Sequence, residues 1–157
     1  MKQADRVKRS SDGLRIYVMA FTTGGLKTAE RLSGIFAQWQ DAEARFFAPA
    51  RIMEAEDDLE ASAAARASGE PAEPSAFSSS SLAEFTSLAF AEADHIIYIG
   101  AAGIAVRAIA PNIKSKDTDP GVIVMDEKAA YVIPILSGHI GGANVLALDL
   151  ARALGAQ

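Results

Sequence analysis

Three times along this chain of 157 residues, a short apolar run leads into a small-residue turn and then into an amphipathic helical pattern. The three turns are rich in glycine and are Thr22–Gly25, Gly100–Gly103 and Ser137–Gly142. Strand, turn and helix in this order form the repeating unit of α/β folds, in which helices cover both faces of a mostly parallel sheet. The order therefore predicts a three-layer, Rossmann-like α/β sandwich.

The predicted strands are short runs rich in β-branched and aromatic residues, and they lie at 14–21, 45–48, 96–99, 122–126 and 131–136. The predicted helices have apolar residues at a spacing of three and four, and they span 26–39, 82–92, a short stretch through Arg107, and 143–154. Four small or charged residues, 127–130, separate the last two strands, which indicates a hairpin near the C-terminal end. Pro111 ends the short helix, and Gly155 ends the last one.

The chain is expected to form a single α/β domain over residues 14–157, preceded by a polar, disordered N-terminus at 1–13. Residues 54–81 interrupt the pattern with seven acidic residues, one basic residue, two prolines and four consecutive serines. We interpret this segment as a low-complexity insertion without a catalytic role. It holds the acidity of the chain, because the remainder has 14 basic and 13 acidic residues.

Several classes of protein are disfavoured by what the sequence lacks. It contains no GxGxxG, GxxxxGK[ST] or GxSxG pattern, which argues against a dehydrogenase, an NTPase and a serine hydrolase. Its two histidines are far apart and it has no cysteine, so no metal-site spacing is present. No apolar run reaches the length of a membrane helix, no basic stripe suggests nucleic acid, and a reducing cytoplasm fits the absence of cysteine.

The three glycine-rich turns are expected to gather at the carboxyl edge of the sheet, where α/β folds bind ligands. Unpaired N–H groups at the starts of the helices would then form a cradle for carboxylates or phosphates. If strand 131–136 runs parallel to the others, strand 122–126 runs against them and begins at that same edge. The connecting loop, 112–120, would then carry its charges toward His139.

His139 is the strongest candidate for chemistry, because it lies between glycines at the start of a helix rather than on an apolar face. An imidazole there could act as an acid, a base or a metal ligand. His95 opens a strand and is expected to be structural. Arg107 could bind a ligand or form a surface ion pair, and Asn144 could cap the last helix or bind a ligand.

Three stretches together resemble the N-terminal region of the cobalt-precorrin 5A hydrolase family of the anaerobic cobalamin pathway. They are GAAGIAVRAIAP, KSKDTDPGVIVMDE and VIPILSGHIGGAN. The resemblance runs from about Leu82 to Gly155 and, more loosely, over residues 14–47. It implies a hydrolase that opens the ring lactone of cobalt-precorrin 5A and releases acetaldehyde, leaving cobalt-precorrin 5B. Members of this family continue into further domains, and a C-terminal domain of that kind is absent from this sequence.

The implied substrate is an anionic cobalt tetrapyrrole, so the cobalt belongs to the substrate and the protein needs no cofactor or metal of its own. The candidate base is His139, Asp117 or Asp119, and His139 could instead contact the cobalt. The N–H groups of Gly141 and Gly142 could stabilise an oxyanion. The residues expected to bind substrate are Gly100, Gly103, Arg107, Lys114, Lys116, Ser137, Gly141, Gly142 and Asn144.

Two other functions remain open at this point. The chain could be a non-catalytic corrinoid-binding module that needs a separate C-terminal domain or partner subunit for activity. A generic Rossmann-like nucleotide binder is a weaker alternative, because the phosphate-binding pattern of that class is missing.

Overall fold

The computed structural model describes residues 13–55 and 77–157, and one six-stranded sheet organises them. The strand order is β3-β2-β1-β4-β5-β6, which is the order of a doubly wound Rossmann sheet. The strands are β1 (Leu14–Ala20), β2 (Ala42–Ala48), β3 (Phe77–Ser79), β4 (His95–Ile99), β5 (Gly121–Met125) and β6 (Val132–Leu136). The first five run parallel, and β6 runs antiparallel to β5.

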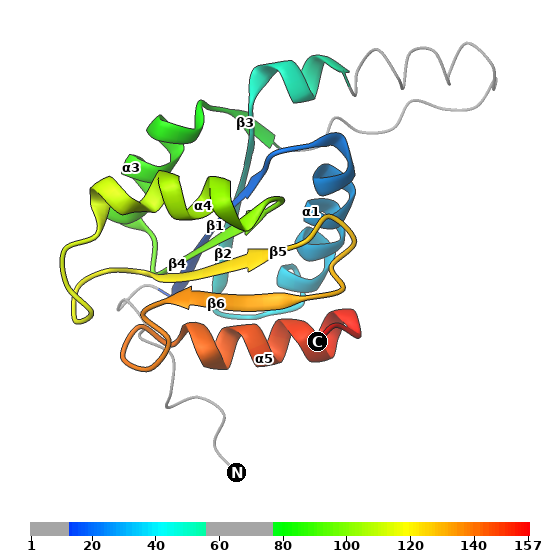
Figure 1. Cartoon of the computed structure of the whole chain (residues 1–157). Helices are drawn as coiled ribbons and strands as arrows, with labels where there is room; N and C mark the ends of the chain where they lie inside the picture. The colour runs from blue at the N-terminus through cyan, green and yellow to red at the C-terminus, as the bar shows by residue number, and fades with distance from the viewer. Residues whose placement is uncertain (1–12, 56–76) are drawn as a thin grey trace, which may run out of the picture.

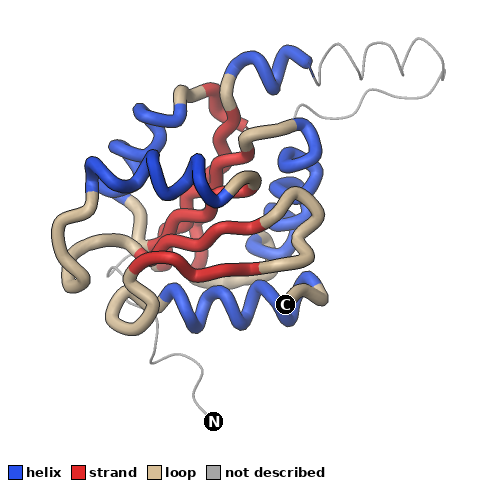
Figure 2. Tube along the Cα trace, in the orientation of Figure 1, coloured by secondary structure: helices blue, strands red, loops and turns tan. Residues whose placement is uncertain are grey.

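Helices cover both faces of this sheet (Figures 1 and 2). One core, which we call the α1/α5 face, lies under α1 (Thr23–Phe36) and α5 (Ala143–Leu154). The second core, the α3/α4 face, lies under α3 (Leu82–Glu92) and α4 (Ala102–Ile109), which a 3-10 turn, η2 (Ala110–Asn112), extends. The strands between them are almost entirely buried, as is usual for a parallel sheet. The predicted three-layer sandwich is confirmed.

The direction of the hairpin strands differs from the sequence-based expectation. The structure pairs β5 in parallel with β4, from His95 opposite Gly121 to Ile99 opposite Met125, and it is β6 that reverses. The connection from Ala102 to Pro120 explains this, because its helix and loop are long enough for a βαβ crossover, which needs a dozen or more residues. The loop before β5 therefore lies at the amino edge of the sheet, not at the carboxyl edge.

Other differences concern where elements begin and end. Helix α1 begins at Thr23, three residues earlier than predicted, because Thr22 caps it by accepting a hydrogen bond from the Gly25 N–H at 3.1 Å. Strand β2 begins at Ala42 rather than at residue 45. Helices α3 and α5 match their predicted bounds.

The end of the segment proposed as an insertion is part of the fold. Residues 77–79 form β3 beside β2, and Ser81 closes a capping box with Glu84 at the start of α3. This corrects the predicted boundary at residue 81. The central part of that segment and the N-terminal residues 1–12 lie outside the described residues.

Candidate functional site

The candidate residues fall into two groups at opposite edges of the sheet. Gly100 and Gly103 follow β4 at the carboxyl edge, whereas the loops 113–120 and 137–142 lie at the amino edge, where β5 begins and β6 ends (Figure 1). Strands of five residues separate the edges by roughly 17 Å. The expectation of three turns at one edge is therefore wrong, since the reversal of β6 moves the third turn to the other side.

The charged loop ends at β5, and the first residue of β5 lies against the histidine loop. Gly121, the first residue of β5, contacts Gly141, because a Cβ built on Gly121 would lie 3.0 Å from the Gly141 carbonyl oxygen. A Cβ on Gly141 would in turn lie 3.4 Å from the Gly121 nitrogen. The C-terminal end of the charged loop therefore lies next to the histidine loop, at the edge opposite to the one predicted.

The charged loop, residues 113–120, is held by Asp119. This carboxylate is only 4% exposed and accepts hydrogen bonds from the backbone N–H groups of Lys114 at 2.9 Å and Ser115 at 3.0 Å. Lys114, Lys116 and Asp117 are exposed around it. Among the candidate bases in this loop, Asp119 has the contacts of a structural carboxylate, and Asp117 faces solvent.

The histidine loop, residues 137–142, presents its imidazole to solvent. His139 is exposed, whereas Gly141 and Gly142 are buried beneath it. Ser137 and Gly142 have φ angles of 51° and 78°, so the chain turns sharply at both ends of the loop. This shape leaves the His139 side chain accessible to a ligand that approaches the amino edge.

The start of α5 is closed by its own loop. The N–H of Gly142 donates to the His139 carbonyl at 3.3 Å, and that of Asn144 donates to the Gly138 carbonyl at 3.1 Å. The N–H of Ala143 donates to the Ser137 carbonyl at 3.4 Å. Gly142 is the N-cap residue, and the Asn144 side chain packs over Gly138 instead of capping the helix. Of the two N–H groups expected to hold an oxyanion, the one on Gly142 is already paired.

At the carboxyl edge, the two glycines have different surroundings. Gly100 has a φ of 141°, and a Cβ there would lie 2.6 Å from Cδ2 of Phe21, so this glycine is needed for packing. Gly103 lies in the first turn of α4 with nothing within 4 Å of the position of a Cβ. The close approach of Phe21 therefore explains why residue 100 is a glycine, and no ligand is needed to explain it.

Arg107 lies in the last turn of α4, exposed on the wall of a groove between α3 and α4. The groove has a volume of about 520 Å³ and is lined by Leu82, Ala83, Ser87, Ile104, Arg107, Ala108, Pro111 and Asn112. No ion pair of Arg107 is found within the described part of the chain. Its guanidinium is therefore available to an anionic ligand on this face.

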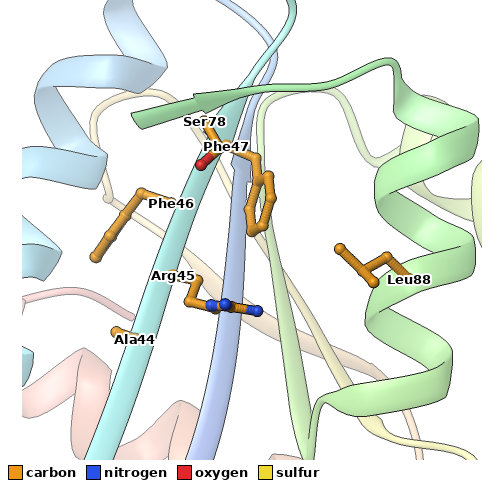
Figure 3. Close-up of a pocket in the computed structure, with 6 residues that line it drawn as sticks. All are labelled: Ala44, Arg45, Phe46, Phe47, Ser78 and Leu88. Carbon is orange, nitrogen blue, oxygen red and sulfur yellow. The ribbon is translucent and has the colours of Figure 1, made fainter. Parts of the chain in front are cut away.

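A second hollow, which no pattern in the sequence predicted, lies beside β2 and the short strand β3 (Figure 3). Its volume is about 420 Å³, and it is lined by Ala44, Arg45, Phe46, Phe47, Ser78 and Leu88. Arg45 donates to the Tyr17 hydroxyl oxygen at 2.7 Å, and this hydroxyl donates to Glu92 at 2.6 Å. Burial, followed by the hydrogen bond to Glu92, raises the pKa of Tyr17. Because Arg45 is engaged with these partners, this hollow is a poor site for carboxylates.

Residues 13–55 and 77–157 contain no group of three histidine, cysteine, aspartate or glutamate side chains that could hold a metal ion. Within the same ranges, no helix has the length and hydropathy required to cross a membrane.

The chain is similar to known proteins through its C-terminal half. A family model described as cobalamin synthesis G N-terminal matches residues 84–157. The cobalt-precorrin-5A hydrolase of Salmonella typhimurium is 53% identical over 69 residues, which are 44% of this chain and 20% of that protein. The enzyme of the same name from Priestia megaterium is 53% identical over 62 residues, which are 40% of this chain and 17% of that protein. The chain thus spans about a fifth of the length of these curated relatives.

A solved structure supports the fold. The crystal structure of a cobalamin biosynthesis protein G homolog from Sulfolobus solfataricus aligns with a TM-score of 0.56 at 20% identity, covering 91% of this chain and 35% of that one. Every candidate residue named from the sequence lies within the segment that the family model matches. Residues 84–157 are thus similar to the cobalamin synthesis G N-terminal family and to two cobalt-precorrin-5A hydrolases.

Proposed function

We propose that this chain acts in cobalamin biosynthesis, in the hydrolysis of the ring lactone of cobalt-precorrin 5A to cobalt-precorrin 5B with release of acetaldehyde. The names of the relatives at 53% identity support the pathway and the substrate. The observation that carries the proposal is the amino edge, where the exposed His139 lies on a loop that contacts the start of β5, directly after the loop that displays two exposed lysines.

The proposed chemistry begins with water, activated by a base, adding to the lactone carbonyl carbon. The acyl–oxygen bond then breaks to leave a carboxylate and a hydroxyl group on the two-carbon fragment, which is still bonded to the macrocycle. Loss of the hydroxyl proton and cleavage of the carbon–carbon bond to the macrocycle then release acetaldehyde, and the electron pair of that bond stays on the macrocycle, where it takes up a proton. We assign the base role to His139 ahead of Asp117, because both are exposed but only an imidazole ordinarily exchanges protons near neutral pH. Asp119, buried and bonded to two backbone N–H groups, holds the loop in this scheme.

Substrate binding is assigned to the exposed cations on this side of the molecule. Lys114 and Lys116 on the loop and Arg107 on α4 are all exposed and can meet the acetate and propionate groups of a tetrapyrrole. In this proposal the cobalt arrives with the substrate, and no further cofactor takes part. A reducing cytoplasm is the expected compartment, and a C-terminal domain or partner subunit is the expected companion.

The experiment that tests the proposal is incubation of the chain with cobalt-precorrin 5A, followed by an assay for acetaldehyde. It should be done alone and together with the remaining segments of the Salmonella typhimurium hydrolase. The His139→Ala variant serves as the inactive comparison, and Arg152→Ala, on the exposed side of α5, serves as the matched control. Absence of acetaldehyde in every parent sample, with the substrate intact, would refute the hydrolase assignment.

The second candidate is a corrinoid-binding module that leaves the chemistry to another domain. It is favoured by the paired N–H groups at the start of α5, which leave less oxyanion stabilisation at the amino edge than the sequence suggested. This candidate predicts that the chain binds the corrinoid stoichiometrically, whereas acetaldehyde appears only after the companion segments are added.

A further inference from the structure

His95 lies directly behind the loop that carries His139. It is the first residue of β4 and pairs with Gly121, the first residue of β5. Side chains alternate along a strand, and Ile97 and Ile99 belong to the core of the α1/α5 face, so the imidazole is on that face as well. Its exposed fraction is 0%.

The imidazole occupies the space that a side chain on Gly121 would need. A Cβ built on Gly121 would overlap Nδ1 of His95 and would lie 2.9 Å from its Cε1. The same Cβ would lie 3.0 Å from the carbonyl oxygen of Gly141, in the histidine loop. Strand, imidazole and loop therefore meet at one point, and the absence of a side chain at Gly121 makes the meeting possible.

The histidine loop is tightly folded at this point. A Cβ on Gly141 would lie 2.5 Å from Cβ of Ser137 and 2.7 Å from its carbonyl oxygen. Ser137 itself has a φ of 51°, a region that residues with a side chain seldom adopt. The start of β5 and the imidazole beside it lie against this corner.

Several buried polar atoms at this point do not contribute to the stability of the fold. Within the described residues, Nδ1 and Nε2 of His95 and Oγ of Ser137 are buried without a hydrogen-bond partner. Burial lowers the pKa of His95 to about 4, with Asp94 acting in the opposite direction, so the imidazole is uncharged at neutral pH. Unpaired buried polar groups reduce stability, and native proteins keep few of them. An aliphatic residue would serve the core better, which points to a role in the neighbouring site.

We propose that His95 is a positioning residue: its imidazole fills the space above Gly121 and so fixes the histidine loop, and with it His139, over the amino edge. The functional part of this inference rests on the proposed role of His139. The placement of the histidine loop does not depend on that role, and it can be measured without a substrate.

The test compares His95→Ala, Gly121→Ala and the double variant, with Gly103→Ala as a matched glycine control in open space. We expect each single change to speed amide hydrogen exchange at residues 138–142 at least tenfold and to shift the NMR signals of the His139 imidazole. In the double variant the new methyl group occupies part of the space that the imidazole leaves. Exchange should therefore return to within about threefold of the parent. Additive effects in the double variant would overturn the proposal.

A further variant keeps the test valid if the alanine variants fold poorly. His95→Leu preserves most of the side-chain bulk and removes the unpaired nitrogens. It should melt at a higher temperature than the parent and should keep exchange at residues 138–142 within threefold of the parent value. A tenfold acceleration in this variant would show that bulk does not position the loop.

Binding of a corrinoid separates this inference from the proposed function. The probe is cobyrinic acid, a stable corrinoid whose side chains end in carboxylates, titrated where all variants are folded. We expect His95→Ala to weaken binding three- to tenfold and the double variant to recover most of the loss. If the parent does not bind, the proposed function fails while the exchange data still decide the role of His95. If His95→Ala binds like the parent, the positioning role is wrong.

Discussion

The two edges of the sheet carry glycine-rich turns that look alike in sequence, yet their contacts differ. At the carboxyl edge, Gly100 makes room for Phe21, and Gly103 faces open space. At the amino edge, Gly121 and Gly141 place the start of β5 against the loop that carries the exposed His139. Glycine content alone thus does not mark a ligand site. The amino edge differs because its glycines lie between the charged loop, residues 113–120, and the loop that carries His139.

The largest expected effect tests the amino edge directly. In an assembly that turns over, His139→Ala should reduce acetaldehyde release by about 100-fold or more, the usual scale for loss of a general base. Because the side chain is exposed, the free energy of unfolding should fall by less than about 1.5 kcal/mol. Rates and denaturant unfolding measured on the same samples check both parts. A variant that unfolds while His139→Gln stays fully active would identify His139 as structural.

At the carboxyl edge, substitutions should change the stability of the protein rather than its activity. Gly100→Ala places a methyl group against Phe21 in a backbone conformation unsuited to alanine, which should cost about 3 kcal/mol of stability. Gly103→Ala, in the helix, should instead stabilise by up to about 1 kcal/mol. Urea unfolding of both variants measures the difference. Similar values for the two would contradict the distinct roles assigned to these glycines.

The buried His95 at the amino edge should make the free energy of unfolding depend on pH. The pKa of His95 is lowered to about 4 by burial, whereas an unfolded histidine titrates near 6.5. The unfolded chain therefore binds the proton first, and stability present above pH 6.5 is lost as the pH falls toward 4. The expected slope is about 1 kcal/mol per pH unit in this window. Unfolding measured from pH 7 to 4.5 should show a shallower slope in His95→Leu, and equal slopes would exclude the buried imidazole as the cause.

The smallest effect concerns the exposed lysines of the charged loop. Changing Lys114 and Lys116 together to alanine should weaken corrinoid binding severalfold at low salt and flatten its dependence on ionic strength, because exposed charges act over about one Debye length. Titration with cobyrinic acid at two salt concentrations measures this. The matched control is Arg152→Ala, whose partner Asp149 lies on α5. Unchanged affinity at low salt would remove these lysines from the binding surface.

Local signals in the sequence were enough to predict most of the elements, although not β3, because caps and periodicity act over a few residues. Gly155 after the last helix marks a helix end that the structure reproduces. The direction of the hairpin could not be obtained in this way. Alternating apolar residues are the same whichever of β5 and β6 runs parallel, and only the length of the crossover before β5 distinguishes the two.

The candidate site was also predictable only in part, where it depends on residues close together in the chain. The C-terminal end of the charged loop lies next to the histidine loop, because both flank the hairpin, whereas the approach of its charged side chains to His139 stays a prediction. The buried environment of Asp119, the pairing of the Gly142 N–H and the position of His95 behind Gly121 depend on contacts between segments far apart in the chain. Such contacts leave no local pattern, so the role of each of these residues could not be predicted from its neighbours in the chain.

Strand β6 has a consequence for how the protein behaves when many copies are present. It lies at the edge of the sheet, where an open ladder of backbone groups would invite another chain to add a strand. The N–H of Val132 is taken by the carbonyl oxygen of Gln157 at 2.7 Å, and Pro134, two residues further on the same side, has no N–H to offer. The antiparallel strand that moved the histidine loop to the amino edge therefore also protects this margin of the sheet from self-association during folding.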